Sequence, residues 1–502
     1  MDGPLRLTFC DLHEGANAVA AALVGSGVGP GDRIGIWAPN SAAWVIASFG
    51  VYAAGAVLVP LNTRYKGEEA GHILRASGTR MLLTVTDFLG TDYTRLLEGV
   101  AGLPDLREVV VMAGATGDGA LSWDHFLQRG QAVDPDAVAS RSRAVEPGDT
   151  SDIIFTSGTT GAPKGAMLGH GASVRTYLEW SSLVDLREAD RYLVVYPFFH
   201  TAGLKSGVLA CVLRGATIHP LAVFDVPTML ALVAEERITM LPGPPTVFQT
   251  ILSHPDLPSF DLSSVRSSVT GAAVVPVEVI RQMREVLDIR TVVTGYGMTE
   301  TTGTISMCRY DDPAEVIATT VGRPLPGVDV RVVDDDGRDV AAGQPGELVV
   351  RGFNIMQGYF GDEQATAAAF VDGWLKTGDV GFVDDAGNLH ITDRKKDMFI
   401  VGGFNVYPAE VEAALLNHPD VAQVAVVGVP DPRMGEIGIA FVVPRPGVRP
   451  DPAEVLAWAR ERLAGYKLTR VEITEALPLN PSGKVMKFKL RERVGEGGVE
   501  RL

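Results

Sequence analysis

Residues 156–165 read TSGTTGAPKG, and the interpretation of the whole chain depends on this run. It follows the apolar residues Ile153-Ile154-Phe155, which predict a strand leading into it. Glycines let the backbone approach a ligand, while hydroxyls, amide N–H groups and the cation of Lys164 suit phosphate oxygens. Walker A spacing is excluded, because Gly158 and Gly161 stand too close together and neither serine nor threonine follows Lys164. Locally, a glycine-rich surface hairpin remains the alternative.

On both sides of this run, helical patterns alternate with short β-rich segments. Helices are predicted over Asp11–Leu23 and Ser41–Gly55, and strands over Arg33–Trp37, Ala56–Leu61, Met81–Thr84 and Val109–Met112. This rhythm is typical of parallel sheets covered by helices. Between Val321 and His390 the pattern changes to short strands with turn signals, among them Val328–Val333 and Glu347–Arg351, which predicts a smaller antiparallel β region.

The wholly charged run DRKKD, residues 393–397, marks a domain boundary. Beyond it, helices are predicted over Pro408–Leu416 and from the capping residue Asp451 to Leu463, with strands over Val421–Val429 and Ile437–Val443. We therefore predict an α/β protein. Its large N-terminal domain, residues 1–393, contains parallel sheets with helices plus the small antiparallel β region, and a small α+β C-terminal domain follows over residues 394–502.

Composition excludes several classes of protein. The 502 residues carry a net charge of −17, and no basic patch offsets it, so we expect no nucleic-acid partner. Three cysteines without a CxxC pair, and no visible signal peptide, favour the cytoplasm. The uncharged stretch Ile34–Thr63 is broken by Pro39, Asn40 and Pro60, which favours buried helix and strand over membrane insertion. A homo-oligomer is left open.

Together with four further motifs, residues 156–165 resemble the AMP-forming adenylating superfamily, which includes acyl-CoA synthetases, firefly luciferase and peptide-synthetase adenylation domains. The further motifs are Tyr296-Gly297-Met298-Thr299-Glu300, Thr377-Gly378-Asp379, Asp393-Arg394 and Pro481-Ser482-Gly483-Lys484. They stand in the family's order almost from end to end of the chain. The resemblance implies a carboxylic acid–CoA ligase that uses ATP, Mg²⁺ and coenzyme A. A small-molecule acid and ATP give acyl-AMP and diphosphate, and CoA then gives acyl-CoA and AMP.

The resemblance also implies roles for individual residues. Nucleotide-binding residues would be Thr156, Ser157, Gly158, Thr159, Thr160, Gly161, Lys164, Gly271, Ala272, Ala273, Tyr296, Gly297, Met298, Thr299, Asp379 and Arg394. Within this set Tyr296 would face adenine, Thr299 the α-phosphate, and Asp379 the ribose hydroxyls, while Glu300 and Thr156 would hold Mg²⁺. Taken singly, Asp379 would be interpreted as a helix cap and Arg394 as part of a surface ion pair; within the set of motifs, the nucleotide-binding roles are favoured.

Three implied features concern the C-terminal domain. Lys484 would enter the site during adenylation, and Gly402-Gly403 would let the pantetheine arm pass the backbone; a plain turn explains these glycines equally well. If one small domain serves both half-reactions, it must be mobile and turn about a hinge near 393–397, at Lys396.

The segment Phe198-Phe199-His200-Thr201-Ala202-Gly203 matches the family's aromatic–His segment, so His200 is assigned to catalysis and to the acid pocket with Gly271 and Gly297. Thr246, Val247 and Phe248 are predicted to line its far wall. Lys205 is unexpected in an apolar run, because a buried ammonium is costly unless paired. We expect it to point to solvent; the alternative is a contact with a polar group of the substrate.

Longer stretches resemble one actinobacterial branch of the family, which activates the indanedione propionate left from steroid ring degradation. These stretches are FFHTAGLKSGVLAC, LPGPPTVF and ATTVGRPLPG. The substrate is therefore predicted to be a fatty acid or an alicyclic, steroid-derived keto acid. Family members usually have a further segment ahead of a motif like Leu7-Thr8-Phe9. We expect either that the start codon is misassigned or that the N-terminal subdomain lacks its first helix, which would leave apolar surface uncovered.

Three other functions compete with this interpretation. An acyl-AMP ligase would load a carrier protein, but no extra segment is visible between Gly358 and Asp393 to restrain the C-terminal domain. A second alternative is an inactive nucleotide-binding paralogue; the presence of Lys164, Glu300 and Lys484 argues against it, because such a protein would not need them. Luciferase-like oxygenation would need a special substrate.

Overall fold

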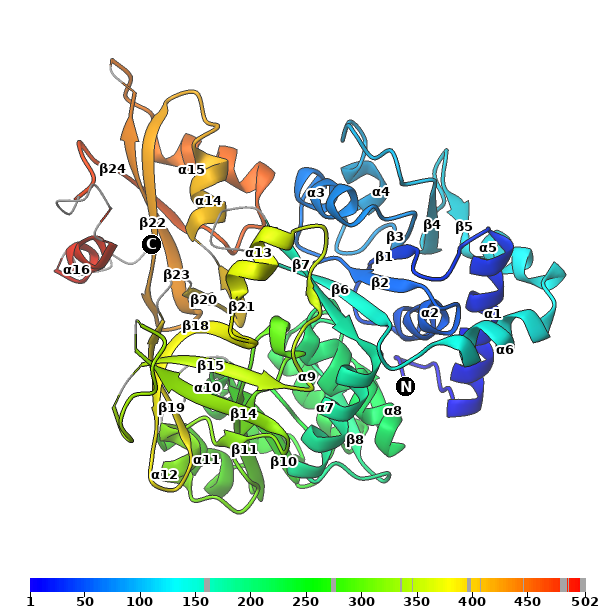
Figure 1. The fold of residues 1–502 in the computed structure, drawn as a ribbon, viewed down its shortest axis with the longest axis horizontal. Helices are drawn as coiled ribbons and strands as arrows, with labels where there is room; N and C mark the ends of the chain where they lie inside the picture. Colours follow the sequence, from blue (N-terminus) through cyan, green and yellow to red (C-terminus); the bar gives the residue numbers. More distant parts are fainter. Residues whose placement is uncertain are drawn as a thin grey trace. The chain divides into compact units, whose positions relative to one another are not determined.

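The computed structural model describes residues 1–157, 163–271, 277–334, 336–344, 346–394, 399–406, 408–445, 447–478, 485 and 487–496. These residues fall into two compact units (Figure 1). The first contains residues 1–63, 70–155 and 165–392. The second contains residues 393–502 together with the short segments 64–69 and 156–164.

An eight-stranded sheet with the order β16-β7-β6-β2-β1-β3-β4-β5 forms one layer of the first unit. Its strands are β1 (Arg33–Trp37), β2 (Val57–Pro60), β3 (Met81–Val85), β4 (Glu108–Ala113), β5 (Leu121–Ser122), β6 (Thr150–Ser157), β7 (Pro163–Gly169) and β16 (Gly358–Tyr359). The pairs from β6 through β5 along this order are parallel, and β16 runs antiparallel to β7. Every residue of β2 and β3 is buried, as expected for strands of a parallel sheet that is covered on both faces.

Helices cover this sheet (Figure 1). They are α1 (Phe9–Gly25), α2 (Ala42–Ala53), α3 (Gly67–Ser77), α4 (Tyr93–Leu96), α5 (Trp123–Gln128) and α6 (Pro135–Ala144), and a 3₁₀ turn, η1, spans Arg129–Ala132. Thr8 begins α1 with a capping box, in which its hydroxyl accepts from the Asp11 amide and the Asp11 carboxylate accepts from Thr8. Helices α1 and α2 approach closely at Gly50, where a Cβ would lie 2.4 Å from Val19.

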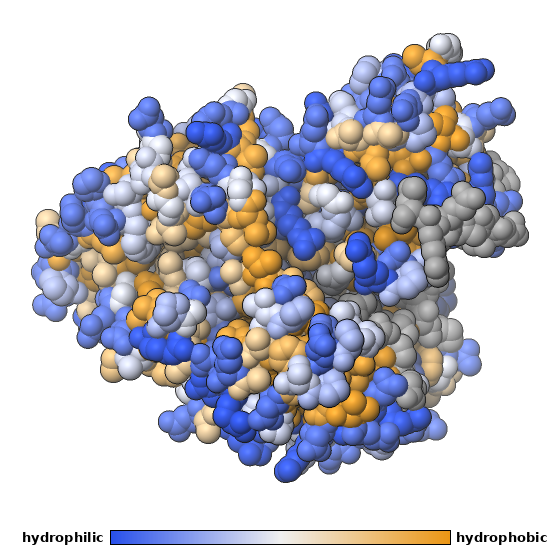
Figure 2. All heavy atoms as spheres, turned by 180° about the vertical axis from the view of Figure 1, so that it is seen from behind, coloured by the Kyte–Doolittle hydropathy of each residue, from blue (hydrophilic) through white to orange (hydrophobic). Residues whose placement is uncertain are grey.

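The uncharged stretch Ile34–Thr63 is confirmed as buried helix and strand, since it forms β1, α2 and β2. Among the described residues, no helix combines the length and apolar character that crossing a bilayer requires. The face drawn in Figure 2 mixes hydrophilic and hydrophobic residues.

A second layer carries most of the candidate site. It contains β8 (Arg191–Val194), β9 (Thr217–Pro220), β10 (Ser267–Gly271), β11 (Thr291–Tyr296), β12 (Ser306–Met307) and β13 (Arg323–Pro324). Its pairs β8–β9 and β10–β11 are parallel, whereas β12 runs antiparallel to both β11 and β13. Helices α7 (His170–Leu183), α8 (Ala210–Arg214), α9 (Val226–Glu235), α10 (Pro245–Leu252), α11 (Val277–Glu285) and α12 (Ala314–Thr319) accompany it, with the 3₁₀ turn η3 at Leu257–Ser259. The connection from β8 to β9 includes a π-helix, η2 (Ala202–Leu209), which leads directly into α8.

The predicted antiparallel region is confirmed. It is the sheet of β14 (Val328–Val333), β15 (Gly346–Gly352), β17 (Phe370–Val371), β18 (Trp374–Val383) and β19 (Leu389–Arg394), with α13 (Glu363–Ala369) preceding β17. Strand β14 has the predicted bounds, and a turn at residues 384–388 joins β18 to β19.

The second unit is the predicted α+β domain with its own core. Its elements are β20 (Phe399–Val401), β21 (Phe404–Val406), α14 (Pro408–Leu415), β22 (Val421–Asp431), β23 (Gly435–Pro444), α15 (Pro452–Arg462), β24 (Arg470–Ile473) and α16 (Lys487–Glu496). The sheet has the order β21-β20-β23-β22, with β24 on β23. One cluster of buried apolar side chains packs α14 and α15 against it, and a second packs α16. Asp451 caps α15 as predicted.

The close approach of α1 and α2 predicts the effect of adding a single methyl group. Gly50→Ala places a Cβ 3.0 Å from the Ala16 carbonyl oxygen as well as against Val19, so we expect it to reduce the free energy of unfolding by about 1–3 kcal/mol. Gly148→Ala is the matched control, because a Cβ there meets nothing within 4 Å. Urea denaturation followed by fluorescence, with the buried Trp44 of α2 as a reporter, measures both variants. Equal midpoints for the two variants would contradict this packing.

Candidate active site

The motif Tyr296–Glu300 begins at the carboxyl end of β11 and turns sharply back on itself. Gly297 lies against the backbone of Gly303, since a Cβ on Gly297 would be 2.4 Å from the Gly303 carbonyl oxygen. The intervening residues form the 3₁₀ turn η4 (Thr299–Thr301), in which Thr299 and Glu300 are buried. Only a glycine fits at position 297, and the side chains of the motif therefore gather at the end of the strand.

The structure brings Tyr296 and Asp379 together from two different sheets. The Tyr296 hydroxyl donates to Asp379 Oδ2 over 2.6 Å. Asp379 lies within β18, where its amide donates to the Thr377 hydroxyl; it is not a helix cap. An aromatic face and a carboxylate thus lie side by side, as recognition of adenine and of ribose hydroxyls requires.

Glu300 is held through both its backbone and its side chain. Its carbonyl oxygen accepts from the Met356 amide, and Oε1 accepts from the Tyr359 hydroxyl, each over 2.8 Å. Tyr359 belongs to β16, which pairs with β7 through Gly358 and Met167. Sequence reasoning missed Tyr359, because no local pattern marks a tyrosine that bonds to a residue 59 positions away.

The donors in this part of the first unit suit Mg²⁺. Glu300 offers a buried carboxylate, and Mg²⁺ prefers hard oxygen ligands while keeping several waters or substrate phosphates. Thr156, the other predicted metal ligand, is grouped with the second unit. Among the described residues there is no group of three or more His, Cys, Asp or Glu that could hold a metal ion. The donor set therefore fits a metal that binds with the nucleotide and has no cage of protein ligands.

The aromatic–His segment runs into the first residues of the π-helix η2, and Asn40 holds its beginning. The Asn40 side chain accepts from the Phe198 amide over 2.8 Å and donates to the Tyr196 carbonyl oxygen over 2.9 Å. This buried amide, 158 residues from Phe198, was also missed by sequence reasoning. Beyond it, His200 Nδ1 accepts from the Ala202 amide over 3.2 Å, so the neutral ring carries its proton on Nε2.

Desolvation holds His200 in the neutral form. His200 is exposed as a residue, and desolvation by the surrounding protein lowers the pKa of its imidazole to about 4. A neutral imidazole with hydrogen on Nε2 can donate to a carboxylate without adding charge. The geometry therefore suits the predicted position of His200 beside the acid.

Several residues predicted for the acid pocket, or their chain neighbours, are placed by backbone contacts of β10, β11 and the loop that follows β11. Thr201 meets Gly303, where a Cβ would lie 3.0 Å from the Cβ of Thr201. Gly271 pairs with Gly295 in the register of β10 and β11. The chain entering α10 is bonded to β10, with the Gly243 amide donating to the Val269 carbonyl oxygen, and the buried Val247 and Phe248 follow within that helix.

Lys205 corrects the sequence analysis. Its side chain is only 2% exposed and its ammonium donates to Asp152, so the expected solvent-facing position is wrong. The physical reason is a buried counter-ion 53 residues away in sequence, which local reasoning could not supply.

Other predicted residues belong to the second unit. Gly402 and Gly403 form the turn between β20 and β21 with φ of +56° and +85°, and the Gly402 amide donates to the Met434 carbonyl oxygen. Thr156 and Lys164 lie in β6 and β7. For Ser157 and Arg394 only the backbone is described, in β6 and β19. Gly158, Thr159, Thr160, Gly161, Thr246's side chain, Ala272, Ala273, Lys396 and Lys484 lie outside the described part of the chain.

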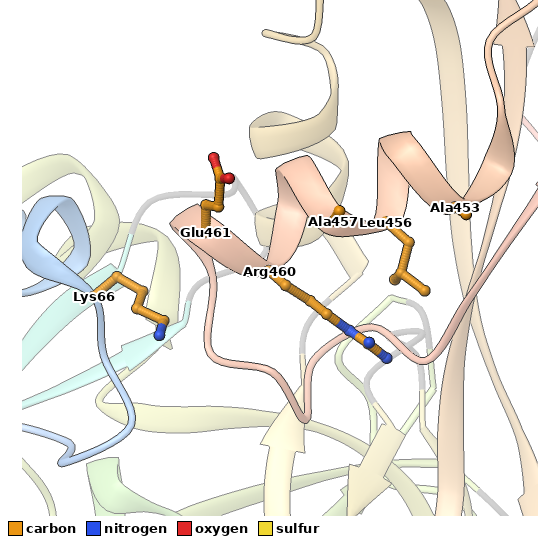
Figure 3. Close-up of a pocket in the computed structure, with 6 residues that line it drawn as sticks. All are labelled: Lys66, Ala453, Leu456, Ala457, Arg460 and Glu461. Atoms are coloured by element: carbon orange, nitrogen blue, oxygen red, sulfur yellow. The ribbon is translucent and has the colours of Figure 1, made fainter. Parts of the chain in front are cut away.

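A hollow of about 530 Å³ lies beside α15 in the second unit (Figure 3). Lys66, Ala453, Leu456, Ala457, Arg460 and Glu461 line it. None of the residues predicted for nucleotide or acid binding is among them, so this hollow does not belong to the candidate active site.

Comparison with known proteins identifies the class. Residues 2–360 match the family model described as AMP-binding enzyme, and residues 410–484 match the AMP-binding enzyme C-terminal domain. The chain therefore belongs to the AMP-binding enzyme family.

Particular relatives narrow the activity. The chain is 48% identical to the 3-[(3aS,4S,7aS)-7a-methyl-1,5-dioxo-octahydro-1H-inden-4-yl]propanoyl:CoA ligase of Rhodococcus jostii, covering 98% of this chain and 94% of the relative. It is 40% identical to the feruloyl-CoA synthase of an Amycolatopsis species, covering 98% and 95%. Among solved structures, the amide bond synthetase McbA of Marinactinospora thermotolerans superposes with a TM-score of 0.85 at 31% identity, covering 98% and 96%.

The chain is thus an acid–thiol ligase of the acyl-CoA synthetase type, with ATP and coenzyme A as its co-substrates. Tyr296, Glu300 and His200 lie within the residues that the first family model matches, whereas Asp379, the partner of Tyr296, lies beyond residue 360.

Buried histidines predict how stability depends on pH. Burial, with Arg191 and the N-terminal ammonium nearby, lowers the pKa of His219 to about 3. Below about pH 6.5 the unfolded chain binds a proton at this residue that the folded chain does not, so stability falls as the pH drops from about 6.5 to 4. We expect the apparent melting temperature to fall over this range, and to fall less steeply in His219→Leu.

His13→Gln is the control, because His13 lies exposed on α1 and its loss should leave the acid dependence unchanged. Differential scanning fluorimetry between pH 4.5 and 7.5 measures all three proteins. Parallel curves for the parent and His219→Leu would contradict a neutral, buried His219.

Proposed function

We propose that the acid activated by this ligase is the bicyclic indanedione propionate, a propanoate side chain on a fused ring system with two ketones. The observation that carries this proposal is the identity of 48% and 49% to two curated ligases named for this acid, from Rhodococcus jostii and Mycobacterium tuberculosis. Both matches extend over at least 97% of this chain. Identity to the feruloyl-CoA synthases is lower, at 40% over a similar length.

The proposed mechanism has two steps. The acid carboxylate attacks the α-phosphate of ATP and diphosphate leaves; the CoA thiol then attacks the acyl carbon and AMP leaves. The first step gathers negative charge on phosphate and carboxylate oxygens, and enzymes stabilise such charge with prearranged donors and cations. Mg²⁺, when bound, supplies a Lewis acid to the phosphate oxygens.

This chain's residues divide the first step among them. Tyr296 and Asp379 bind adenosine; Glu300, oriented by Tyr359, holds the metal; and Thr299 donates to the α-phosphate. His200 orients the acid carboxylate through Nε2–H, and its neutral form leaves that carboxylate nucleophilic. Lys164 and Lys484 supply the cations of this first step.

The second step uses the C-terminal domain. Gly402-Gly403 give passage to the pantetheine arm of coenzyme A, and the domain turns about Lys396 between the two steps.

The decisive experiment follows AMP formation from ATP with a panel of acids, with and without coenzyme A. The panel contains short, medium and long fatty acids, benzoate, ferulate and the indanedione propionate. We expect AMP to form fastest with the indanedione propionate, with kcat/KM at least about tenfold above decanoate, because an enzyme's pocket discriminates between acids by their differential binding in the transition state.

Each other outcome has a meaning of its own. Equal turnover of decanoate and the keto acid would contradict the proposed substrate. Accumulation of acyl-AMP that coenzyme A does not discharge would point to a carrier protein or an amine as acceptor. Absence of AMP with every acid would contradict the proposed reaction and favour the inactive paralogue.

A further inference from the structure

Lys205 and Asp152 form a fully buried ion pair in the first unit. The Lys205 ammonium donates to Asp152 Oδ2, and the two side chains are 2% and 0% exposed. Lys205 lies in the π-helix η2, and Asp152 lies in β6, which leads toward Thr156. The pair therefore ties the strand that approaches the phosphate-binding run to the segment that follows His200.

Every oxygen of Asp152 has a protein donor. The Tyr52 hydroxyl donates to Oδ1 over 2.6 Å, and the Ser151 hydroxyl donates to Oδ2 beside the lysine. The Lys205 ammonium also lies 5.6 Å from the centre of the Tyr52 ring, within reach of a cation–π interaction. The ammonium and carboxylate thus satisfy one another inside the unit.

Such a pair contributes little to net stability, because desolvation of both charges offsets most of their attraction. The pair nevertheless constrains the geometry strongly, because a movement that separated the two groups would leave an unpaired charge in the interior and destabilise the fold. The pair therefore restricts which positions of η2 relative to β6 are allowed.

The opposite side of η2 is equally constrained. A Cβ on Gly203 would lie 2.1 Å from the Pro197 carbonyl oxygen, and one on Gly207 would lie 2.4 Å from a methyl group of Val194. In a helix with roughly four residues per turn, positions 203 and 207 share one side and position 205 lies nearly opposite. Backbone contact on one side and the ion pair on the other hold η2 between β6 and the chain that leaves β8.

Residues immediately before η2 are those predicted to lie beside the acid. His200 lies two residues before the helix, and Thr201 contacts Gly303 in the loop that also carries Glu300. A π-helix has one more residue per hydrogen-bonded turn than an α-helix, so relaxation to α geometry would rotate these side chains away. The position of η2 therefore determines the shape of the pocket at His200.

We propose that Asp152 and Lys205 are a positioning pair that fixes η2, and through it His200 and Thr201, so that the pair determines which acids the ligase accepts. Neither residue touches the acid. The inference rests on the proposed function for the identity of the acid. It takes the place of the alternative from the sequence, in which Lys205 itself contacts a polar group of the substrate.

The test compares Lys205→Met, Asp152→Asn and the double variant with the parent chain. Each single variant is expected to lower the melting temperature, because it leaves one buried charge unpaired, and the double variant to recover most of that loss. The double variant should nonetheless raise KM for the indanedione propionate about tenfold, lower its preference over decanoate by a similar factor, and leave KM for ATP within about twofold. Hydrogen exchange at residues 202–209 should be faster in it than in the parent.

Asp190→Asn is the matched control. Asp190 is a buried carboxylate that bonds to Arg266 and to the Thr239 hydroxyl, and it precedes the amino end of β8. Its loss should reduce stability without changing the ratio of kcat/KM between the two acids. Tyr52→Phe is a milder variant that removes one bond to Asp152 and keeps both charges, and it should raise KM for the keto acid about twofold to threefold.

Three results would overturn the inference. A stable double variant with parental acid preference would make the pair purely structural. Loss of preference in Lys205→Met with full preference in Asp152→Asn would mean that the ammonium contacts the acid. If all three charge variants fail to fold, Tyr52→Phe decides: an unchanged preference of that variant for the keto acid over decanoate would also reject the positioning role. Failure of the proposed function is distinguishable, because the parent chain itself would then show no preference for the keto acid.

Discussion

The close contact between Gly297 and Gly303 is the constraint on which the site in the first unit depends. It closes the loop after β11 tightly, so that two side chains of the loop reach partners on other strands and a glycine of the loop lies against a third residue. Tyr296 reaches Asp379, Glu300 reaches Tyr359, and Gly303 leaves room for Thr201. One backbone turn thereby links residues proposed for adenosine, for the metal and for the acid. A side chain at either glycine would separate these partners.

Two buried carboxylates in the first unit each accept a hydrogen bond from a tyrosine hydroxyl. Asp152 accepts from Tyr52 and also bonds to the Lys205 ammonium and the Ser151 hydroxyl, so its charge is compensated inside the protein. This arrangement suits a structural ion pair. Glu300 accepts from Tyr359, which fixes the direction of a carboxylate proposed to hold a metal.

Much of the fold was predictable from local sequence. Strand β14 and the capped helix α15 were anticipated nearly residue by residue, because alternation and an Asp-Pro cap are short-range signals. The predicted residues Tyr296, Asp379, Glu300 and His200 could be named from motifs, although their roles remain proposals. Partners distant in sequence were not predictable: Asn40 for Phe198, Tyr359 for Glu300 and Asp152 for Lys205 all depend on the tertiary fold. Lys205 was misplaced for that reason alone.

The central claim is that Glu300, oriented by Tyr359, holds the metal of an AMP-forming ligase. The most direct measurement is the Mg²⁺ dependence of ATP–diphosphate exchange in Tyr359→Phe, together with Mn²⁺ binding followed by electron paramagnetic resonance in the presence of ATP. Removal of the hydroxyl frees the Glu300 carboxylate to rotate, so the Mg²⁺ concentration for half-maximal exchange should rise about fivefold or more, while KM for the acid stays within about twofold. An unchanged Mg²⁺ dependence with unchanged Mn²⁺ affinity would contradict the claim.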